Sequence, residues 1–79
     1  MIKEFTSTKD FSVGDLFLNP DGQPLCFIVK ITQHRKGAQY EYEMEYFKTR
    51  AFSHPKYINT KRLKEKVEYW HWKHIPVVK

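Results

Sequence analysis

The stretch YEYEMEYF at residues 40–47 constrains the fold of this chain more than any other feature. Aromatic or apolar side chains occupy every second position from Tyr40 to Tyr46, and the positions between them hold Glu41, Glu43 and Glu45. Because successive side chains of a β-strand point to opposite faces of its sheet, this alternation predicts a strand with one dry and one wet face. We expect the tyrosines and Met44 to pack inward and the glutamates to lie in water.

Two further strands precede this stretch. Residues 16–18 are a short apolar run, and residues 25–33, LCFIVKITQ, have the β-branched and aromatic character typical of a central strand. Between them, NPDGQP predicts a tight turn in which Gly22 adopts a positive φ. On the central strand, one face is expected to hold Leu25, Phe27, Val29 and Ile31, and the tyrosines are expected to pack on the Phe27 face.

The tyrosine strand is expected to run from Gln39 to Arg50, with a bend or bulge at residues 46–48 where the alternation breaks. Pro55 interrupts the sheet because it cannot donate a hydrogen bond to a neighbouring strand.

After this loop, Thr60 is expected to cap one or two helical turns over KRLKEKV, with Leu63 and Val67 on the inward side. The remaining residues, EYWHWKHIPVV, predict a closing strand. Trp70 and Trp72 share one side of that strand, and core packing is favoured for both rings over exposure as platforms for bases.

This succession of elements resembles the small SH3-like barrels. The resemblance covers residues 11–76 and is carried by Val13-Gly14-Asp15 before the first strand and by Leu63 before Trp70 and Trp72. It implies a mainly β fold: a five-stranded SH3-like barrel, closed on itself, with one short helical turn before the last strand. A five-stranded oligonucleotide-binding barrel is the alternative, although its usual helix is longer. Residues 11–79 are expected to form one domain, and residues 1–10 a loosely ordered segment or a short edge.

Size and composition narrow the class of protein. A chain of 79 residues that is 41% hydrophobic and 16% aromatic is long enough for one compact domain and unlike a disordered chain. The single cysteine, Cys26, lies in an apolar run without an intramolecular partner, which favours a reducing compartment. The N-terminus lacks the apolar core of a signal peptide, and the longest apolar run is far shorter than the roughly 20 residues that span a bilayer. We therefore expect a cytoplasmic protein that does not contact membranes.

Catalytic and metal chemistry find little support. His71 and His74 have H-x-x-H spacing, but residues three apart on a strand point to opposite faces, and one cysteine with scattered histidines is no recognisable ligand set. The three glutamates of the tyrosine strand share one wet face, whereas an acid–base pair needs two different environments. We expect a non-catalytic protein without metal, cofactor or small-molecule substrate.

Charge is divided unevenly along the chain. Residues 1–47 carry five Lys or Arg and seven Asp or Glu, a net charge of −2, whereas residues 48–79 carry nine and two, a net charge of +7. The basic half also holds flat aromatic rings, so phosphate-binding cations lie close to surfaces on which bases stack. The expected binding residues are Lys48, Arg50, Lys56, Tyr57, Lys61, Arg62, Lys64, Lys66, His71 and Lys73.

Two kinds of partner fit this composition. The first is nucleic acid, DNA or RNA, bound with little sequence discrimination because no recognition helix is evident. The second is an acidic protein, to which the chain would dock as an interaction or inhibitor module, since Tyr, Trp and Arg also dominate protein interfaces.

Overall fold

The computed structural model describes residues 2–47 and 55–77 of the chain. The fold is mainly β with one short helix, as the alternating patterns predicted. In chain order the elements are β1 (Lys3–Phe5), β2 (Leu16–Leu18), β3 (Pro24–Gln33), β4 (Tyr40–Tyr46), β5 (Tyr57–Asn59), α1 (Thr60–Glu68) and β6 (Lys73–Ile75).

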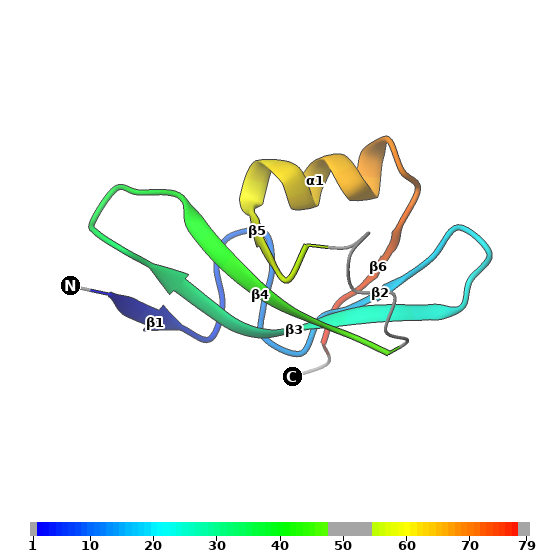
Figure 1. The fold of residues 1–79 in the computed structure, drawn as a ribbon, viewed down its shortest axis with the longest axis horizontal. Helices are drawn as coiled ribbons and strands as arrows, with labels where there is room; N and C mark the ends of the chain where they lie inside the picture. Colours follow the sequence, from blue (N-terminus) through cyan, green and yellow to red (C-terminus); the bar gives the residue numbers. More distant parts are fainter. Residues whose placement is uncertain (1, 48–54, 78–79) are drawn as a thin grey trace.

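The six strands form one antiparallel sheet with the order β5-β4-β3-β2-β6 (Figure 1). The ten-residue β3 is central: β4 pairs along one side of it, and β2 and β1 pair with successive parts of the other side. The sheet is not closed into a barrel, so the expected five-stranded barrel is not confirmed. The sheet stays open because its last strand, β6, has only three residues. It pairs with β2 and does not reach the strand at the opposite edge, β5.

The central strand changes phase at a β-bulge. Ile28 pairs with Met44 and Lys30 with Glu43, so Val29 is an extra residue in β3. The buried side chains of β3 are therefore Cys26, Ile28 and Ile31. The prediction that Phe27 and Val29 lie on the inward face was wrong. The bulge shifts which residues of β3 point inward, and a sequence pattern does not show where a bulge occurs. The bend or bulge predicted at residues 46–48 lies partly outside the described residues.

The tyrosine strand has the dry face that its alternation predicted. Tyr42 and Met44 are fully buried, and Tyr40 and Tyr46 are partly buried against the same core. Buried deep, the Tyr42 hydroxyl is hydrogen-bonded to Thr8 Oγ1 at 2.9 Å and to Thr60 Oγ1 at 3.1 Å. On the other face of this strand, Glu45 is exposed, whereas Glu41 and Glu43 are half-buried.

Helix α1 covers one face of the sheet (Figure 1), and the core lies between them. Leu63 is fully buried and Val67 packs against the core, so the predicted inward positions are confirmed. The helix has nine residues, about two and a half turns. Its cap is Asn59, whose Oδ1 accepts a hydrogen bond from the Arg62 amide at 2.8 Å. The predicted cap, Thr60, already donates its hydroxyl to Tyr42.

The turn between β2 and β3 forms as predicted. Gly22 has a φ of 88° and its amide donates to the Asn19 carbonyl at 2.9 Å. Asn19 Oδ1 also accepts from the Gln23 amide at 3.0 Å, which holds the turn closed.

The N-terminal segment contributes the short strand β1, which pairs with residues 31–33 of β3. Phe5 lies partly buried against the core, edge-on to the Tyr40 ring at 5.2 Å.

Candidate nucleic-acid interface

Helix α1 places four of the predicted basic residues around its solvent side. Lys61 and Arg62 are exposed, on the helix surface away from the buried Leu63, and Arg62 makes a long, exposed ion pair of 4.0 Å with Glu65. Lys64 lies on one flank, where its Nζ is 3.1 Å from the Asp10 carboxylate. Of the helix cations, Lys61 and Arg62 are therefore the most available to an anionic partner.

The opposite flank of α1 ends in an aromatic turn. Lys66 Nζ lies 4.6 Å from the centre of the Trp70 ring and 5.6 Å from that of Trp72, within the range of cation–π attraction. Trp70 is 63% exposed and Tyr69 is 73% exposed, whereas Trp72 is only 7% exposed and belongs to the core. The placement predicted for Trp72 is confirmed, and that for Trp70 was wrong.

His71 separates the two tryptophans. Its φ is 59°, a left-handed conformation that is uncommon for residues other than glycine. This turn ends the continuous strand that the pattern EYWHWKHIPVV predicted, so Trp70 and Trp72 no longer alternate on one side. The strand begins only at Lys73. His71 itself is exposed beside Trp70.

The remaining predicted residues that the structure describes do not join this surface. Tyr57 pairs with Glu43 on the sheet face opposite to the buried Ile58, with Lys56 Nζ 5.7 Å from its ring centre. Lys73 pairs with Leu18 and therefore lies on the face of β2 opposite to the buried Phe17. Lys48 and Arg50 are outside the described residues.

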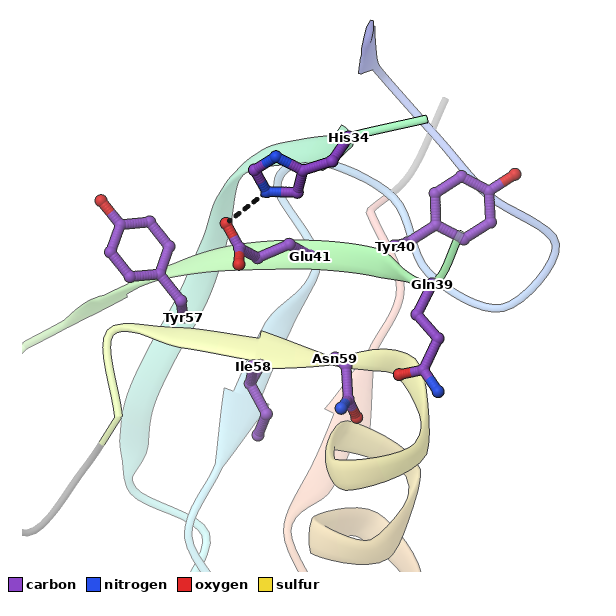
Figure 2. A pocket seen from close by; sticks show the side chains of 7 residues that line it. All are labelled: His34, Gln39, Tyr40, Glu41, Tyr57, Ile58 and Asn59. Atoms are coloured by element: carbon purple, nitrogen blue, oxygen red, sulfur yellow. Dashed lines mark ion pairs between the residues drawn. The ribbon is translucent and has the colours of Figure 1, made fainter. Parts of the chain in front are cut away.

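Tyr57 instead lines a pocket of about 320 Å³ near the β3–β4 loop (Figure 2). The pocket also holds Glu41, whose Oε1 lies 3.7 Å from His34 Nε2. Together with Glu43 and Glu45 on the same face, this carboxylate makes the β4 side of the sheet a poor surface for phosphates.

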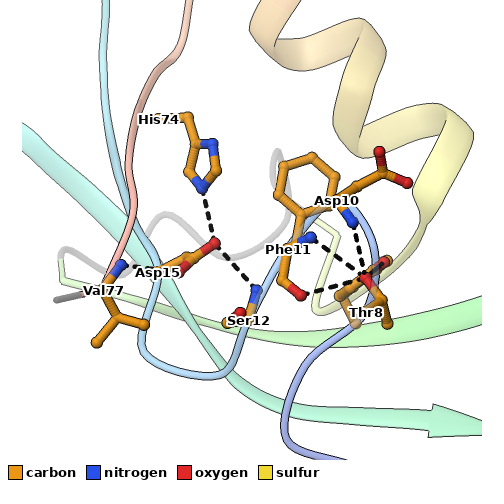
Figure 3. Close-up of polar contacts among 8 residues, drawn as sticks. Thr8, Asp10, Phe11, Ser12, Asp15, His74 and Val77 are labelled. Carbon is orange, nitrogen blue, oxygen red and sulfur yellow. Dashed lines mark hydrogen bonds and ion pairs between the residues drawn. The ribbon is translucent and has the colours of Figure 1, made fainter. Parts of the chain in front are cut away.

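Sequence reasoning missed the most buried polar pair of the described chain, Asp15 and His74 (Figure 3). The Asp15 side chain is 3% exposed. Its Oδ2 accepts from the Ser12 amide at 3.0 Å and from His74 Nε2 at 2.7 Å, and its Oδ1 accepts from the Val77 amide at 2.9 Å. No local signal could have joined two residues 59 positions apart.

These contacts make Asp15 an anchor for the C-terminal end of the chain. The carboxylate binds groups from the loop before β2, from β6 and from the segment after β6. The His74 ring is also held between two aromatic rings: it stacks on Phe17 at 5.1 Å and meets Phe11 edge-on at the same distance. Because backbone amides and ring packing fix both partners, we interpret the pair as structural.

The described residues offer few groups for covalent or metal chemistry. Burial raises the pKa of the Cys26 thiol to about 12, so the thiolate that would act as a nucleophile is disfavoured. Burial, followed by the charge of Cys26, also raises the pKa of Tyr46. Within residues 2–47 and 55–77, no three His, Cys, Asp or Glu side chains gather as a metal site requires. No helix in this part of the chain has the length and apolar character needed to cross a membrane.

Comparisons with known proteins add no family to this description. No protein-family model, curated protein or solved structure matches the chain. The resemblance to SH3-like barrels therefore stays a prediction from the order of elements.

Proposed function

We propose that this chain is a non-catalytic module that binds single-stranded nucleic acid along α1. Phosphates contact the cations of the helix, and a base stacks on the Trp70 ring at its end. The observation that carries this proposal is the exposure of Trp70, 63%, directly beside the basic helix. A flat exposed ring next to cations is the arrangement by which proteins bind single strands with little regard for sequence.

The cost of this arrangement supports a ligand-binding role. Burying a large apolar side chain contributes about 1.5–3 kcal/mol to stability, and Trp70 forgoes most of that gain. The left-handed conformation of His71, the residue after Trp70, costs about 1 kcal/mol more. Strained backbone is found preferentially at functional sites, where the surrounding structure and the ligand offset it. Lys66 holds the exposed ring in place by its cation–π contact, which reduces the entropy lost when a base stacks.

The dimensions of α1 suit a short single strand. Nine helical residues rise about 13 Å, which matches about four stacked nucleotides at roughly 3.4 Å each. A strand of this length passes Lys61, Arg62 and Lys66 before it reaches Trp70. Lys64 contributes less, because its ammonium group is already paired with Asp10.

Fluorescence anisotropy with labelled DNA and RNA oligonucleotides of about 12 nucleotides tests the proposal. Three phosphate contacts predict that log K falls with log salt with a slope of about −2, at about 0.7 per phosphate on a single strand. The double variant Lys61→Ala, Arg62→Ala is expected to reduce the size of that slope by about 1.4. The matched control is Arg35→Ala, Lys36→Ala, an equal loss of charge in the exposed β3–β4 loop, which should leave the slope unchanged.

Trp70→Ala isolates the stacking contribution. Its loss is expected to weaken binding by about 5-fold to 150-fold, equivalent to about 1–3 kcal/mol. Tyr57→Ala is the control, because Tyr57 lies on the other face of the sheet. Absence of binding to both DNA and RNA at about 50 mM salt would refute the proposal. Recovery of one stoichiometric acidic protein from nuclease-treated lysate would then favour the protein partner.

A further inference from the structure

The face of the sheet away from α1 carries an apolar stripe. Residues paired directly across antiparallel strands share a face. Leu16 pairs with Phe27 of β3 on one side and with Ile75 of β6 on the other. Its neighbour Phe17 points into the core, so Leu16 and its partners lie on the opposite face of the sheet. The stripe consists of Leu16, Leu18, Phe27, Phe47 and Ile75.

No described element covers this stripe. Phe47 is 54% exposed, with its ring centre 5.4 Å from that of Phe27, and Ile75 is 45% exposed. Leu16, Leu18 and Phe27 are only half-buried. Contiguous exposed apolar side chains, in contrast to scattered ones, are typical of an interaction surface.

Charges of opposite sign flank the stripe. On one side, β4 carries Glu41, Glu43 and Glu45 on this face, and Glu45 pairs directly with Phe27. On the other side, β6 carries the exposed Lys73, which pairs with Leu18. Lys30 of β3 also lies on this face, paired with Glu43, so the acidic charge directly beside the stripe is Glu45 and the basic charge on its other flank is Lys73.

We propose that this face binds a second copy of the chain in a symmetric dimer, with its twofold axis parallel to the strands. Rotation about such an axis lays the stripe of one protomer on the stripe of the other. It also exchanges the two flanks, so that each Lys73 meets the β4 glutamates of the other protomer. Glu45 is the glutamate nearest to Lys73 of the other protomer. It lies in one row with Phe27 and Leu16, and Lys73 pairs with Leu18, two residues further along β2.

The charge pattern selects this axis over its alternative. A twofold axis perpendicular to the strands would lay β4 on β4 and oppose the two glutamate rows, and like charges across an interface suppress association. The selected axis keeps the strands of both sheets aligned, which is a common geometry for sheets that pack face to face. A standard interface of about 800 Å² per partner is roughly one seventh of the 5920 Å² accessible surface. The helix surfaces remain on the outside of the dimer.

Sedimentation equilibrium of the full chain over about 1–500 μM, a range that brackets weak dimers, tests the proposal. A mass that rises with concentration from 9.6 kDa to twice that value is expected. Phe27→Asp should shift the association by at least about 100-fold, because Phe27 lies between Leu16 and Phe47 inside the stripe and the change places a charge there. Tyr69→Asp, which changes a more exposed aromatic residue on the α1 side in the same way, is the control and should dimerise normally.

A charge exchange tests the orientation of the protomers. Lys73→Glu and Glu45→Lys should each weaken association by about tenfold, because each places like charges in contact across the interface. The double variant Glu45→Lys, Lys73→Glu restores opposite charges and should recover association to within about threefold of the unaltered chain.

A monomer at every concentration, an assembly larger than a dimer, or equal effects of Phe27→Asp and Tyr69→Asp would each overturn the proposal. Failure of the charge exchange to restore association would overturn the parallel axis. Far-UV circular dichroism of each variant confirms that it is folded. Nucleic-acid binding by α1 is measured separately, so either proposal can fail without the other.

Discussion

Replacing Asp15 by Ala should remove much of the stability of this domain. The Asp15 carboxylate is almost completely buried and accepts three hydrogen bonds, two from backbone amides and one from His74. Alanine leaves all three donors without their acceptor. The backbone hydrogen bond from the Ile28 amide to the Asp15 carbonyl, 3.1 Å long, is retained because it does not involve the side chain.

The size of the loss follows from the surroundings of the three donors. A buried donor left without a partner costs about 1–3 kcal/mol. Water reaches Val77, which is 37% exposed, so its amide falls at the low end of that range. With about 1 kcal/mol for the Val77 amide and about 1–3 kcal/mol for each of the other two donors, the sum is about 3–7 kcal/mol.

Such a loss is large for a small domain. At about 0.05–0.15 kcal/mol per residue, 79 residues give a total stability of about 4–12 kcal/mol. Each kcal/mol shifts the Tm of a domain of this size by about 4–8 °C, so Asp15→Ala should lower Tm by at least about 12 °C. Urea unfolding and thermal unfolding, both followed by circular dichroism, measure the change. Asp21→Ala in the exposed turn is the matched control and should change stability by less than about 0.5 kcal/mol.

A double-mutant cycle identifies the source of the loss. His74→Phe keeps a ring beside Phe17 but removes the Nε2 donor, so it should cost about 1.5–3 kcal/mol. If Asp15 and His74 stabilise the fold through their contact, the stability lost by the double variant should be smaller than the summed losses of the two single variants. The expected difference is about 0.5–3 kcal/mol. Additive losses, or a loss below about 1 kcal/mol for Asp15→Ala alone, would show that the carboxylate is not the anchor.

Two further changes probe single features of the fold. His71→Gly should stabilise the domain by about 1 kcal/mol in urea unfolding, because glycine adopts a φ of 59° without strain; an unchanged or lower stability would contradict the strain assigned to this turn. Burial raises the pKa of the Cys26 thiol to about 12, so as pH rises the thiol ionises in the unfolded chain before it ionises in the folded protein. The free energy of unfolding should therefore fall as pH rises above about 8.5, by up to about 1.4 kcal/mol per pH unit. Cys26→Ala should flatten this alkaline decline between about pH 8.5 and 10.5, and an equally steep decline in both proteins would assign it to other groups.

Sequence patterns predicted those parts of this protein that depend on neighbouring residues. The alternation from Tyr40 to Tyr46 placed a strand and its dry face, because the two-residue period of a strand is a local property of the backbone. Gly22 marked its turn because few other residues adopt a positive φ without strain. Leu63 and Val67 marked the inward side of α1 through their spacing of four.

The candidate binding surface was predicted only in part. The basic residues of α1 were identified by composition, and Lys61 and Arg62 do lie in solvent. Composition could not show that Tyr57 and Lys73 lie on the other side of the sheet, because that depends on strand pairing. It also could not show that Trp70 is exposed, because that depends on the irregular turn between α1 and β6, in which His71 has a positive φ.

The sequence by itself thus determined where strands, turn and helix form, since the free energies that select them act over a few residues. Only the tertiary structure decided the phase of β3 after the bulge at Val29, the open edges of the sheet and the pairing of Asp15 with His74. These features depend on contacts between residues far apart in the chain. The energies of such contacts become defined only when the whole core is assembled.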